Sequence, residues 1–576
     1  MRNGVFLTKK SISLRSVVSG HIPLFTLIIT YFLTRLPYIG FVPLWDGAVY
    51  YWFARYAKIG VTTVETHGHI SFLYMWLVSV PARLAGEKIE LFNCFLILFT
   101  ICSIYAFYKL LEIFLGKYVS GPEIGLFTAV FAFHPTVLSN TINLNLDQGL
   151  MIFYLLFLLS YLKERYFFAT VFAVFLIFTK ETALLLLPAT MITAFLCYPG
   201  KRQRKSITGT LQLLSLVMLC FGVYAFHKTQ IAGQPLFWHG LGGVDQLFSK
   251  FITFPETGGY FKVQLVQLFV MNFQWVLTII FMIFLVAFPV FFRRRIPEDA
   301  ENNILFCGAL FFVLFLLLSR FYPYSNSRYL LVLFPVFLLL FAQLTVLCVP
   351  EKSLRMGLCA FFLFLFALSL YQTADPVSRK IFGTFRFGEH EMLKMTSVAG
   401  DGCGYGRDQL VYNFQFMQFH YMQNLVFREI RPDQDSIILS SSEAWPSALM
   451  GRLRRDNYQR TVAKKNSILP VYETVEEFRK RASGTPEAYY IAYPNVDNGK
   501  QISYLASRFS YSNNIIVKSK GYSLEVVRFY NDRSGFVAPD KTARKIIKAS
   551  VRSGSRESFT NVVMEDMVCS DGKTPP

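Results

Sequence analysis

Residues 167–195 read FFATVFAVFLIFTKETALLLLPATMITAF, an apolar stretch of 29 residues that is interrupted by the charged pair Lys180–Glu181. Charge inside a membrane is costly, so the pair indicates either a functional site or a turn whose lysine reaches back to the interface. The apolar residues on its two sides predict two short helices, 166–178 and 182–197, that meet at this pair. The stretch therefore predicts a helical hairpin in a membrane, with charge at its tip.

The composition extends this interpretation to most of the chain. Hydrophobic residues make up 53% of the 576 residues and only 16% are charged, against about 25% charged in soluble domains. Long apolar segments recur up to residue 372, and several are shorter than the roughly 17 to 25 residues usual for a span. We predict a polytopic α-helical membrane protein with about 11 to 13 transmembrane helices. The eleven predicted segments are 21–43, 89–115, 123–138, 147–162, 166–178, 182–197, 207–227, 264–292, 304–318, 329–349 and 356–372.

The basic residues predict the orientation of these segments. With residues 1–20 inside the cell, the inner loops contain 16 Lys and Arg in 56 residues, whereas the outer loops contain 10 in 102 residues. This bias agrees with the positive-inside rule, so much of the net charge of +20 reflects orientation and not a nucleic-acid partner. An odd number of spans places the C-terminal region outside, together with the first outer loop.

The first outer loop, residues 44–88, is long and rich in aromatic residues. Its segment ISFLYMWLVSV (Ile70–Val80) is short for a membrane span, and Trp76, Tyr74 and Tyr51 suit a helix lying at the level of the lipid headgroups. We therefore expect the loop to lie along the membrane surface. The alternative is a pair of short spanning helices within the same loop.

From residue 373 the chain becomes charged and has no apolar run long enough to span. We predict a small soluble α/β domain over 373–533, on the outer, periplasmic side, followed by a basic and poorly patterned tail over 534–576. Lys520–Gly521 is a plausible hairpin turn between the last two strands. The predicted strands are 435–441, 488–494, 513–519 and 522–530, and the predicted helix is 471–482.

Two acids stand where predicted spans meet the outer side. Asp46 lies in PLWDGAVYYWFARYA (Pro43–Ala57), directly after the first segment, and Asp147 opens a helix after Asn-Leu-Asn-Leu. A carboxylate at such a rim reaches both lipid-borne and aqueous groups, so Asp46 is a candidate acid/base. Helix N-caps favour Asp strongly, and capping remains the alternative for both residues.

Fixed cations lie at the same predicted side. Lys180 is at the tip of the hairpin, and Arg320 and Arg328 bracket the turn SRFYPYSNSRY (Ser319–Tyr329). Two arginines outside run against the orientation bias, so they suit an anion there, with lipid headgroups as the alternative ligand. Carboxylates and cations beside the lipid suit a lipid-linked phosphate as leaving group and a hydroxyl as nucleophile.

Four stretches in this order resemble the GT-C fold membrane glycosyltransferases, in particular the superfamily of protein O-mannosyltransferases and lipid A aminoarabinose transferases (ArnT-like). Their order and spacing over residues 20–200 carry the resemblance, and SRYLLVLFPV (Ser327–Val336) is similar more loosely. The stretches are WDGAVYYWFARYA (Trp45–Ala57), HGHISFLYMWLVSVPARLAGE (His67–Glu87), HPTVLSNTINLNLDQGLMIFYLLFLL (His134–Leu159) and FTKETALLLLP (Phe178–Pro188).

The resemblance implies roles for matching residues. Asp46 matches an acid that serves as base or orients the acceptor, and Asp147 matches a second outer acid. Lys180 and Arg328 match positions near the lipid phosphate, where Arg320 and His69 are further candidates. Residues expected to contact the acceptor or to shape the first outer loop are Trp45, Tyr50, Glu65 and His67.

Two departures from the family pattern bear on these roles. Many relatives have two adjacent acids where this chain has Asp46–Gly47, which argues against a bridging divalent metal, and no Cys/His spacing resembles a zinc site. The Pro-Pro pair of the family is missing from residues 67–73, so the path of that loop differs.

The resemblance implies a glycosyltransferase in the bacterial inner membrane. It would move a sugar from a polyprenyl phosphate to a periplasmic acceptor, such as lipid A, a glycan or a protein hydroxyl, with inversion at the sugar carbon. The rival class is a polyprenyl-linked lipid flippase or transporter, whose usual signs are internal repeats and helices broken at the midplane. A scaffold that displays the outer domain is a third class.

Overall fold

The computed structural model describes most of the membrane part and the strands of the C-terminal part. The described residues are 14–40, 46–56, 65–66, 69–86, 88–141, 144–198, 203–231, 268–271, 273–289, 298–321, 327–371, 375–393, 422, 425, 437–440, 468–470, 487–492, 499–507, 509–531, 547–551 and 558–567. The helix predicted at 471–482 lies outside them.

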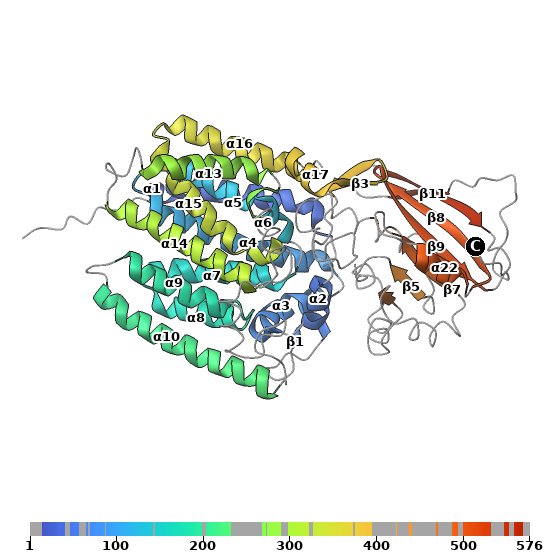
Figure 1. Cartoon of the computed structure of the whole chain (residues 1–576), viewed down its shortest axis with the longest axis horizontal. Helices are drawn as coiled ribbons and strands as arrows, with labels where there is room; N and C mark the ends of the chain where they lie inside the picture. The colour runs from blue at the N-terminus through green and yellow to red at the C-terminus, as the bar shows by residue number, and fades with distance from the viewer. Residues whose placement is uncertain are drawn as a thin grey trace, which may run out of the picture.

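Each of the eleven predicted apolar segments overlaps a described helix, and these helices form one bundle (Figure 1). The segment predicted at 123–138 is divided between α5 (Gly121–Ala132) and the short helix α6 (Pro135–Asn140), and parts of 21–43 and 264–292 lie outside the described residues. By length and composition, α4, α10, α14 and α16 are long and apolar enough to cross a membrane, and the others are shorter apolar helices. The bounds are α1 Leu14–Arg35, α4 Ile89–Leu115, α5 Gly121–Ala132, α7 Leu146–Leu162, α8 Tyr166–Ile177, α9 Ala183–Cys197, α10 Gln203–Phe226, α13 Gln274–Ala287, α14 Glu298–Phe321, α15 Leu333–Cys348 and α16 Lys352–Tyr371.

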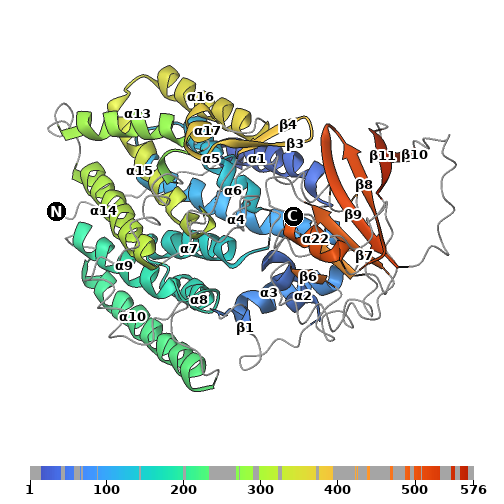
Figure 2. The same cartoon turned by 45° about the vertical axis from the view of Figure 1, so that its right-hand side comes forward.

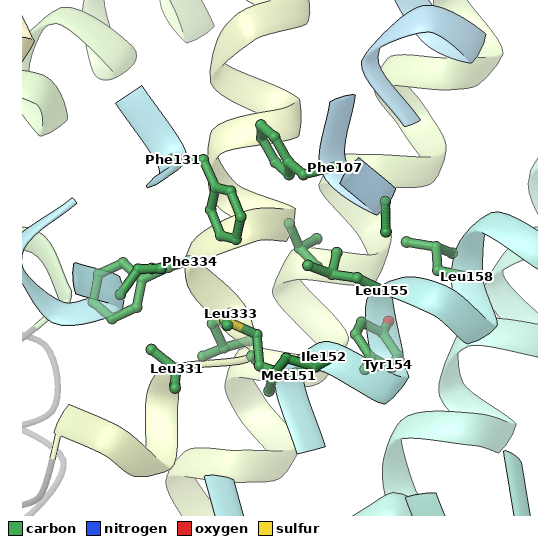
Figure 3. Close-up of a cluster of buried hydrophobic side chains, with 14 of the residues drawn as sticks. Phe107, Phe131, Met151, Ile152, Tyr154, Leu155, Leu158, Leu331, Leu333 and Phe334 are labelled. Atoms are coloured by element: carbon green, nitrogen blue, oxygen red, sulfur yellow. The ribbon is translucent and has the colours of Figure 1, made fainter. Parts of the chain in front are cut away.

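The bundle has an apolar interior built mainly on α4, α7 and α15. Every residue of α15 from Leu333 to Val346 is buried, which suits a helix that is apolar all round. Figure 3 shows Met151 and Ile152 of α7 next to Leu333 of α15, with Phe107 of α4 in the same cluster. Large apolar side chains are exposed on the peripheral helices α1, α10 and α13, as expected where helices face lipid acyl chains.

The first outer loop contributes α2 (Asp46–Tyr56), the two-residue strands β1 (Glu65–Thr66) and β2 (His69–Ile70), and α3 (Phe72–Ala85). Trp76 is exposed, in agreement with the headgroup interpretation, but Tyr51 and Tyr74 are buried in the bundle. The expectation for these two tyrosines was wrong because α2 packs on α3, and α3 packs on α4, which turns both rings inward.

The C-terminal part forms a seven-stranded sheet in the order β10-β11-β8-β9-β7-β5-β6. Strand β5 pairs in parallel with β6 and β7, and the remaining pairs are antiparallel. Two strands, β10 and β11, come from the tail that the sequence pattern left without predicted structure. The bounds are β5 Ile437–Ser440, β6 Ile468–Pro470, β7 Glu487–Ala492, α22 Gly499–Ala506, β8 Tyr511–Ser519, β9 Tyr522–Tyr530, β10 Ile547–Val551 and β11 Ser558–Met567.

The turn between β8 and β9 is the one that the sequence predicts. Lys520 and Gly521 both have positive φ, 51° and 79°, which is the requirement of a tight hairpin whose twist matches its strands. The register of the two strands continues to the pair Ser519–Tyr522 next to the turn.

A short connection joins the bundle to the sheet. After α16 the chain forms α17 (Pro376–Phe382) and the hairpin of β3 (Thr384–Phe387) and β4 (His390–Leu393). Asp375 caps α17 and also accepts hydrogen bonds from Phe273 N (3.3 Å) and Trp275 Nε1 (3.1 Å) at the start of α13. The end of the last apolar helix is thereby fixed to the end of another, on the side of the bundle that faces the sheet (Figure 1).

The β3–β4 hairpin in turn contacts the β8–β9 turn through backbone atoms. Glu389 N donates to Gly521 O (2.7 Å), and a Cβ at Gly388 would lie 2.2 Å from the same oxygen. Only glycine fits there, both for this contact and for its φ of +67°. Figure 2, which shows the protein from another side, also has this hairpin between α17 and the sheet.

A buried ion pair connects three helices at the end of the bundle that lies away from the sheet. Ser120 and Glu123 form a capping box at the start of α5, and Glu123 Oε1 accepts from Arg355 Nη2 (2.5 Å) and Nε (2.9 Å). Arg355 also donates to the carbonyl oxygens of Val349 and Pro350, after α15. One guanidinium thus connects α5, α15 and α16.

We expect Glu123→Gln to destabilise the bundle by about 3–5 kcal/mol, because it leaves the buried Arg355 without its counterion. The double variant Glu123→Gln/Arg355→Met should be less destabilised than the sum of the single variants. Chemical unfolding of the detergent-purified protein measures both. The control is Lys109→Met, whose partly exposed pair with Glu112 should contribute less than about 1 kcal/mol. Equal small losses of stability in all variants would contradict a stabilising role of the ion pair between Glu123 and Arg355.

Candidate functional site

The start of α7 is organised by its cap, Asn145. The Asn145 side chain accepts a hydrogen bond from Gln148 N (2.6 Å), which is the N-cap contact of this helix. Asp147 lies in the first turn and is not the cap. The capping alternative for Asp147 is therefore excluded, and its carboxylate is available for other partners.

Asp147 contacts two cations that come from separate parts of the chain. Its Oδ1 is 2.6 Å from Lys180 Nζ, at the turn between α8 and α9, and its Oδ2 is 3.4 Å from Arg328 Nε. Arg328 belongs to η5, a 3-10 turn at Ser327–Leu330. The three side chains are at most 7% exposed, so their charges interact in a medium where water screens little.

An aromatic ring completes this group. Lys180 Nζ lies 4.4 Å from the centre of the Tyr329 ring, and the Arg328 guanidinium carbon lies 5.3 Å from it. Cations at these distances over a ring face are attracted by its quadrupole. Asp147, Lys180, Arg328 and Tyr329, here called the outer charge cluster, carry two positive charges and one negative charge.

Close packing fixes the helix that carries Asp147. Tyr74 of α3 donates its hydroxyl to Asn145 O (3.0 Å), and a Cβ at Gly149 would lie 2.5 Å from the Tyr74 ring. Gln148 Nε2 donates to Thr100 Oγ1 of α4 (2.7 Å). The first turn of α7 is therefore held from two sides, which fixes the direction of the Asp147 side chain.

The other member of the charged pair, Glu181, faces away from the outer charge cluster. Its Oε2 accepts from the Tyr224 hydroxyl of α10 (3.3 Å), and both residues are buried. Lys180 and Glu181 thus belong to one turn but contact different helices, α7 and α10 respectively.

The structure brings together three of the predicted site residues, Asp147, Lys180 and Arg328. Asp46 begins α2, and Tyr50 is buried in the same helix. The remaining predictions lie where side chains are outside the described part of the protein. These are the side chains of Asp46, Glu65, His69 and Arg320, and the whole of Trp45 and His67.

Several residues of the site were not predicted from sequence. Tyr329 follows Arg328 directly, so its position next to a predicted cation was the available signal. Tyr74 lies in the second of the four stretches that resemble the family. Asn145 has the residue type and position of an N-cap. Tyr224 lies inside an apolar segment with no neighbouring charge, and nothing in the sequence singled it out.

Among the described side chains, no group of three or more His, Cys, Asp or Glu residues is placed to hold a metal ion. The outer charge cluster, with two cations around one carboxylate, suits an anion and not a metal.

The fold is similar to that of a protein of known structure. No family model and no curated protein sequence matches the chain. Among solved structures, it is similar to ArnT from Cupriavidus metallidurans bound to undecaprenyl phosphate, with 11% identity and a TM-score of 0.50 over 88% of this chain and 98% of that one. The apo state of the same protein gives 11% identity and a TM-score of 0.47, covering 89% and 98%.

The resemblance predicted from four stretches is thus confirmed at the level of the fold, and across most of the chain. The protein is a mostly helical, polytopic membrane protein with a small C-terminal sheet, and its fold is that of ArnT.

Proposed function

We propose that this protein is a glycosyltransferase that moves a sugar from a polyprenyl phosphate to a hydroxyl of an acceptor outside the cytoplasm. The observation that carries the proposal is the outer charge cluster, a buried pair of cations at the helix ends that face the sheet. The fold supports it, because the ArnT structure of the same fold was solved with undecaprenyl phosphate.

The cluster suits the phosphate of such a donor. Lys180 and Arg328 place two positive charges beside Asp147 in a poorly screened site. The negative charge of a phosphodiester would be attracted by both cations. As the bond from the sugar carbon to the phosphate oxygen breaks, negative charge grows on the phosphate, and the two cations stabilise it.

The reaction is a direct displacement. The acceptor hydroxyl oxygen attacks the anomeric carbon, and the carbon–oxygen bond to the phosphate breaks with its electron pair on the phosphate. The transition state resembles an oxocarbenium ion, and the configuration inverts. The proton of the hydroxyl passes to a carboxylate, for which we assign Asp46.

Asp147 takes a different part in this scheme. It already accepts a hydrogen bond from Lys180 and lies close to Arg328, so both of its oxygens face cations. We assign it the positioning of the two cations. We assign the base to Asp46 because of its position. It opens α2, which packs on α3, and Tyr74 of α3 contacts the start of α7.

The arrangement also supports a location for the acceptor. In Figure 1, α2, α3 and the C-terminal sheet lie at one end of the bundle, and α1 begins at the other. With the basic inner loops in the cytoplasm, this end faces the periplasm of a bacterial inner membrane. The sheet then covers the site or helps to select a lipid A, glycan or protein acceptor.

Replacing either cation tests the phosphate site. We expect Lys180→Met and Arg328→Met each to lower the transfer rate by about 10²–10³-fold, as the loss of one group that stabilises the leaving charge does. The measurement is transfer of radiolabel from polyprenyl-phosphate sugar to endogenous acceptors in membranes. Lys109→Met, which removes a lysine paired with Glu112 in another part of the bundle, should leave the rate unchanged. Equal effects of all three changes would argue against the assignment.

Replacing Asp46 separates the enzyme from its rival. Asp46→Asn should reduce label transfer by about 10²–10⁴-fold, the usual contribution of a general base. In a flippase the label would cross the membrane still attached to the lipid, and the variant would behave as wild type. Sealed vesicles with label supplied on one side report both events.

The orientation has an independent test. Single cysteines placed at residue 46 and near residue 530 should react with a membrane-impermeant maleimide from the same side of sealed inner-membrane vesicles, with Lys201→Cys reacting from the other. Opposite sides for the first two positions would overturn the proposal.

A further inference from the structure

A second buried polar group lies beside the outer charge cluster. It consists of Glu181, Tyr224 and His227, here called the Glu181 group. Glu181 follows Lys180 directly in the turn between α8 and α9, so its Cα lies about 3.8 Å from that of Lys180. Its carboxylate accepts from the Tyr224 hydroxyl at 3.3 Å. The Glu181 group therefore starts at the residue next to the cation that we assign to the phosphate.

Tyr224 and His227 present the same face of their helix. They are three residues apart, a spacing that places side chains above one another on a helix. The two residues are 0% and 5% exposed, whereas Val223 and Phe226 are 48% and 61% exposed. The buried face of α10 turns toward α8 and α9, against which this helix packs, and Figure 1 shows α10 along their outer side.

His227 has an unusual environment. It is the first residue of a π-helical turn, His227–Ile231, at the end of α10. Such turns are rare and occur frequently at functional sites. Both ring nitrogens are buried, and neither has a hydrogen-bond partner in the described structure. Leaving buried polar atoms unpaired is unfavourable, so a polar ligand for this ring would remove that penalty.

The chemistry of the three side chains identifies the ligand class. The carboxylate accepts hydrogen bonds, the phenol both donates and accepts, and a neutral imidazole has one donor and one acceptor nitrogen. Sugar hydroxyls need this mixed set, because each of them donates and accepts. A phosphate needs donors and positive charge, which the outer charge cluster supplies on the other side of Lys180.

We propose that the Glu181 group binds the hydroxyls of the sugar carried by the polyprenyl phosphate and selects which sugar is transferred. This inference rests on the proposed function, because the sugar is bonded to the phosphate that Lys180 and Arg328 hold. The phosphate fixes the anomeric carbon near Lys180, and the ring hydroxyls extend toward Glu181, Tyr224 and His227. His227 is a specificity residue in this scheme and takes no proton in the reaction.

The test compares two ligands on the full-length protein in nanodiscs. One is undecaprenyl phosphate, and the other is a panel of undecaprenyl phosphates carrying glucose, mannose, galactose or 4-amino-4-deoxyarabinose. Wild type should bind at least one sugar-bearing lipid more tightly than the bare lipid. His227→Phe and Tyr224→Phe should each weaken that binding by about tenfold, the effect of one lost hydrogen bond in a buried site, and leave the bare lipid unaffected. Lys180→Met should weaken binding of both ligands.

The matched control is Tyr154→Phe. Tyr154 is a buried tyrosine whose hydroxyl pairs with Thr190 between α7 and α9, and its loss should leave the preference between the two ligands unchanged. If wild type binds neither lipid, the proposed function fails. If it binds both, and the His227 and Tyr224 variants lose affinity for both equally or for neither, the sugar assignment fails. Unchanged donor binding with a raised acceptor KM would overturn it too, in favour of an acceptor site.

Discussion

The attraction between one buried carboxylate and two buried cations is the interaction on which the rest of this structure depends. Asp147, Lys180 and Arg328 come from three places in the chain, and none of them could be buried without the others. Their meeting point fixes the turn between α8 and α9 and the turn before α15 against the start of α7. The apolar helices can be rearranged by many small changes, but this contact admits only one relative placement of these three ends.

The interior around this contact explains why it can persist. α15 is buried along almost its whole length, and the first turn of α7 is enclosed by Tyr74 and Gln148. Excluding water raises the strength of each charge interaction and also raises the cost of an uncompensated charge. Two cations in such a site attract an anion strongly. The Glu181 group starts at the next residue and has a different chemistry, because it combines a carboxylate, a phenol and an imidazole.

The sequence was most informative where one physical effect dominates. Apolar length alone located eleven of the described helices, and the residue pair Lys520–Gly521 located a hairpin turn whose two positions have positive φ. Charge scarcity pointed to Asp147, Lys180 and Arg328, because buried ions are rare enough to stand out. The roles of these residues stay predictions, and so does that of Asp46, whose side chain lies outside the described structure.

Other features depend on contacts between distant residues, which no local pattern reveals. Tyr74 and Tyr51 are of a residue type that is common at membrane interfaces. Both are nevertheless buried, because α2 packs on α3 and α3 packs on α4. Tyr224 matters because its hydroxyl meets Glu181 from another helix, and His227 is buried on the same face of that helix as Tyr224. Strands β10 and β11 form in a stretch of weak alternation, since β8 supplies an edge with which β11 can pair.

The glycine at 388 has a mechanical consequence. A hairpin whose backbone touches the β8–β9 turn without any intervening side chain cannot slide or tilt there without losing its hydrogen bond to Gly521. The sheet is therefore fixed to α17 and, through Asp375, to the beginning of α13. A force on the sheet is therefore passed through this hairpin to the ends of α17 and α13 and is not absorbed by a flexible linker.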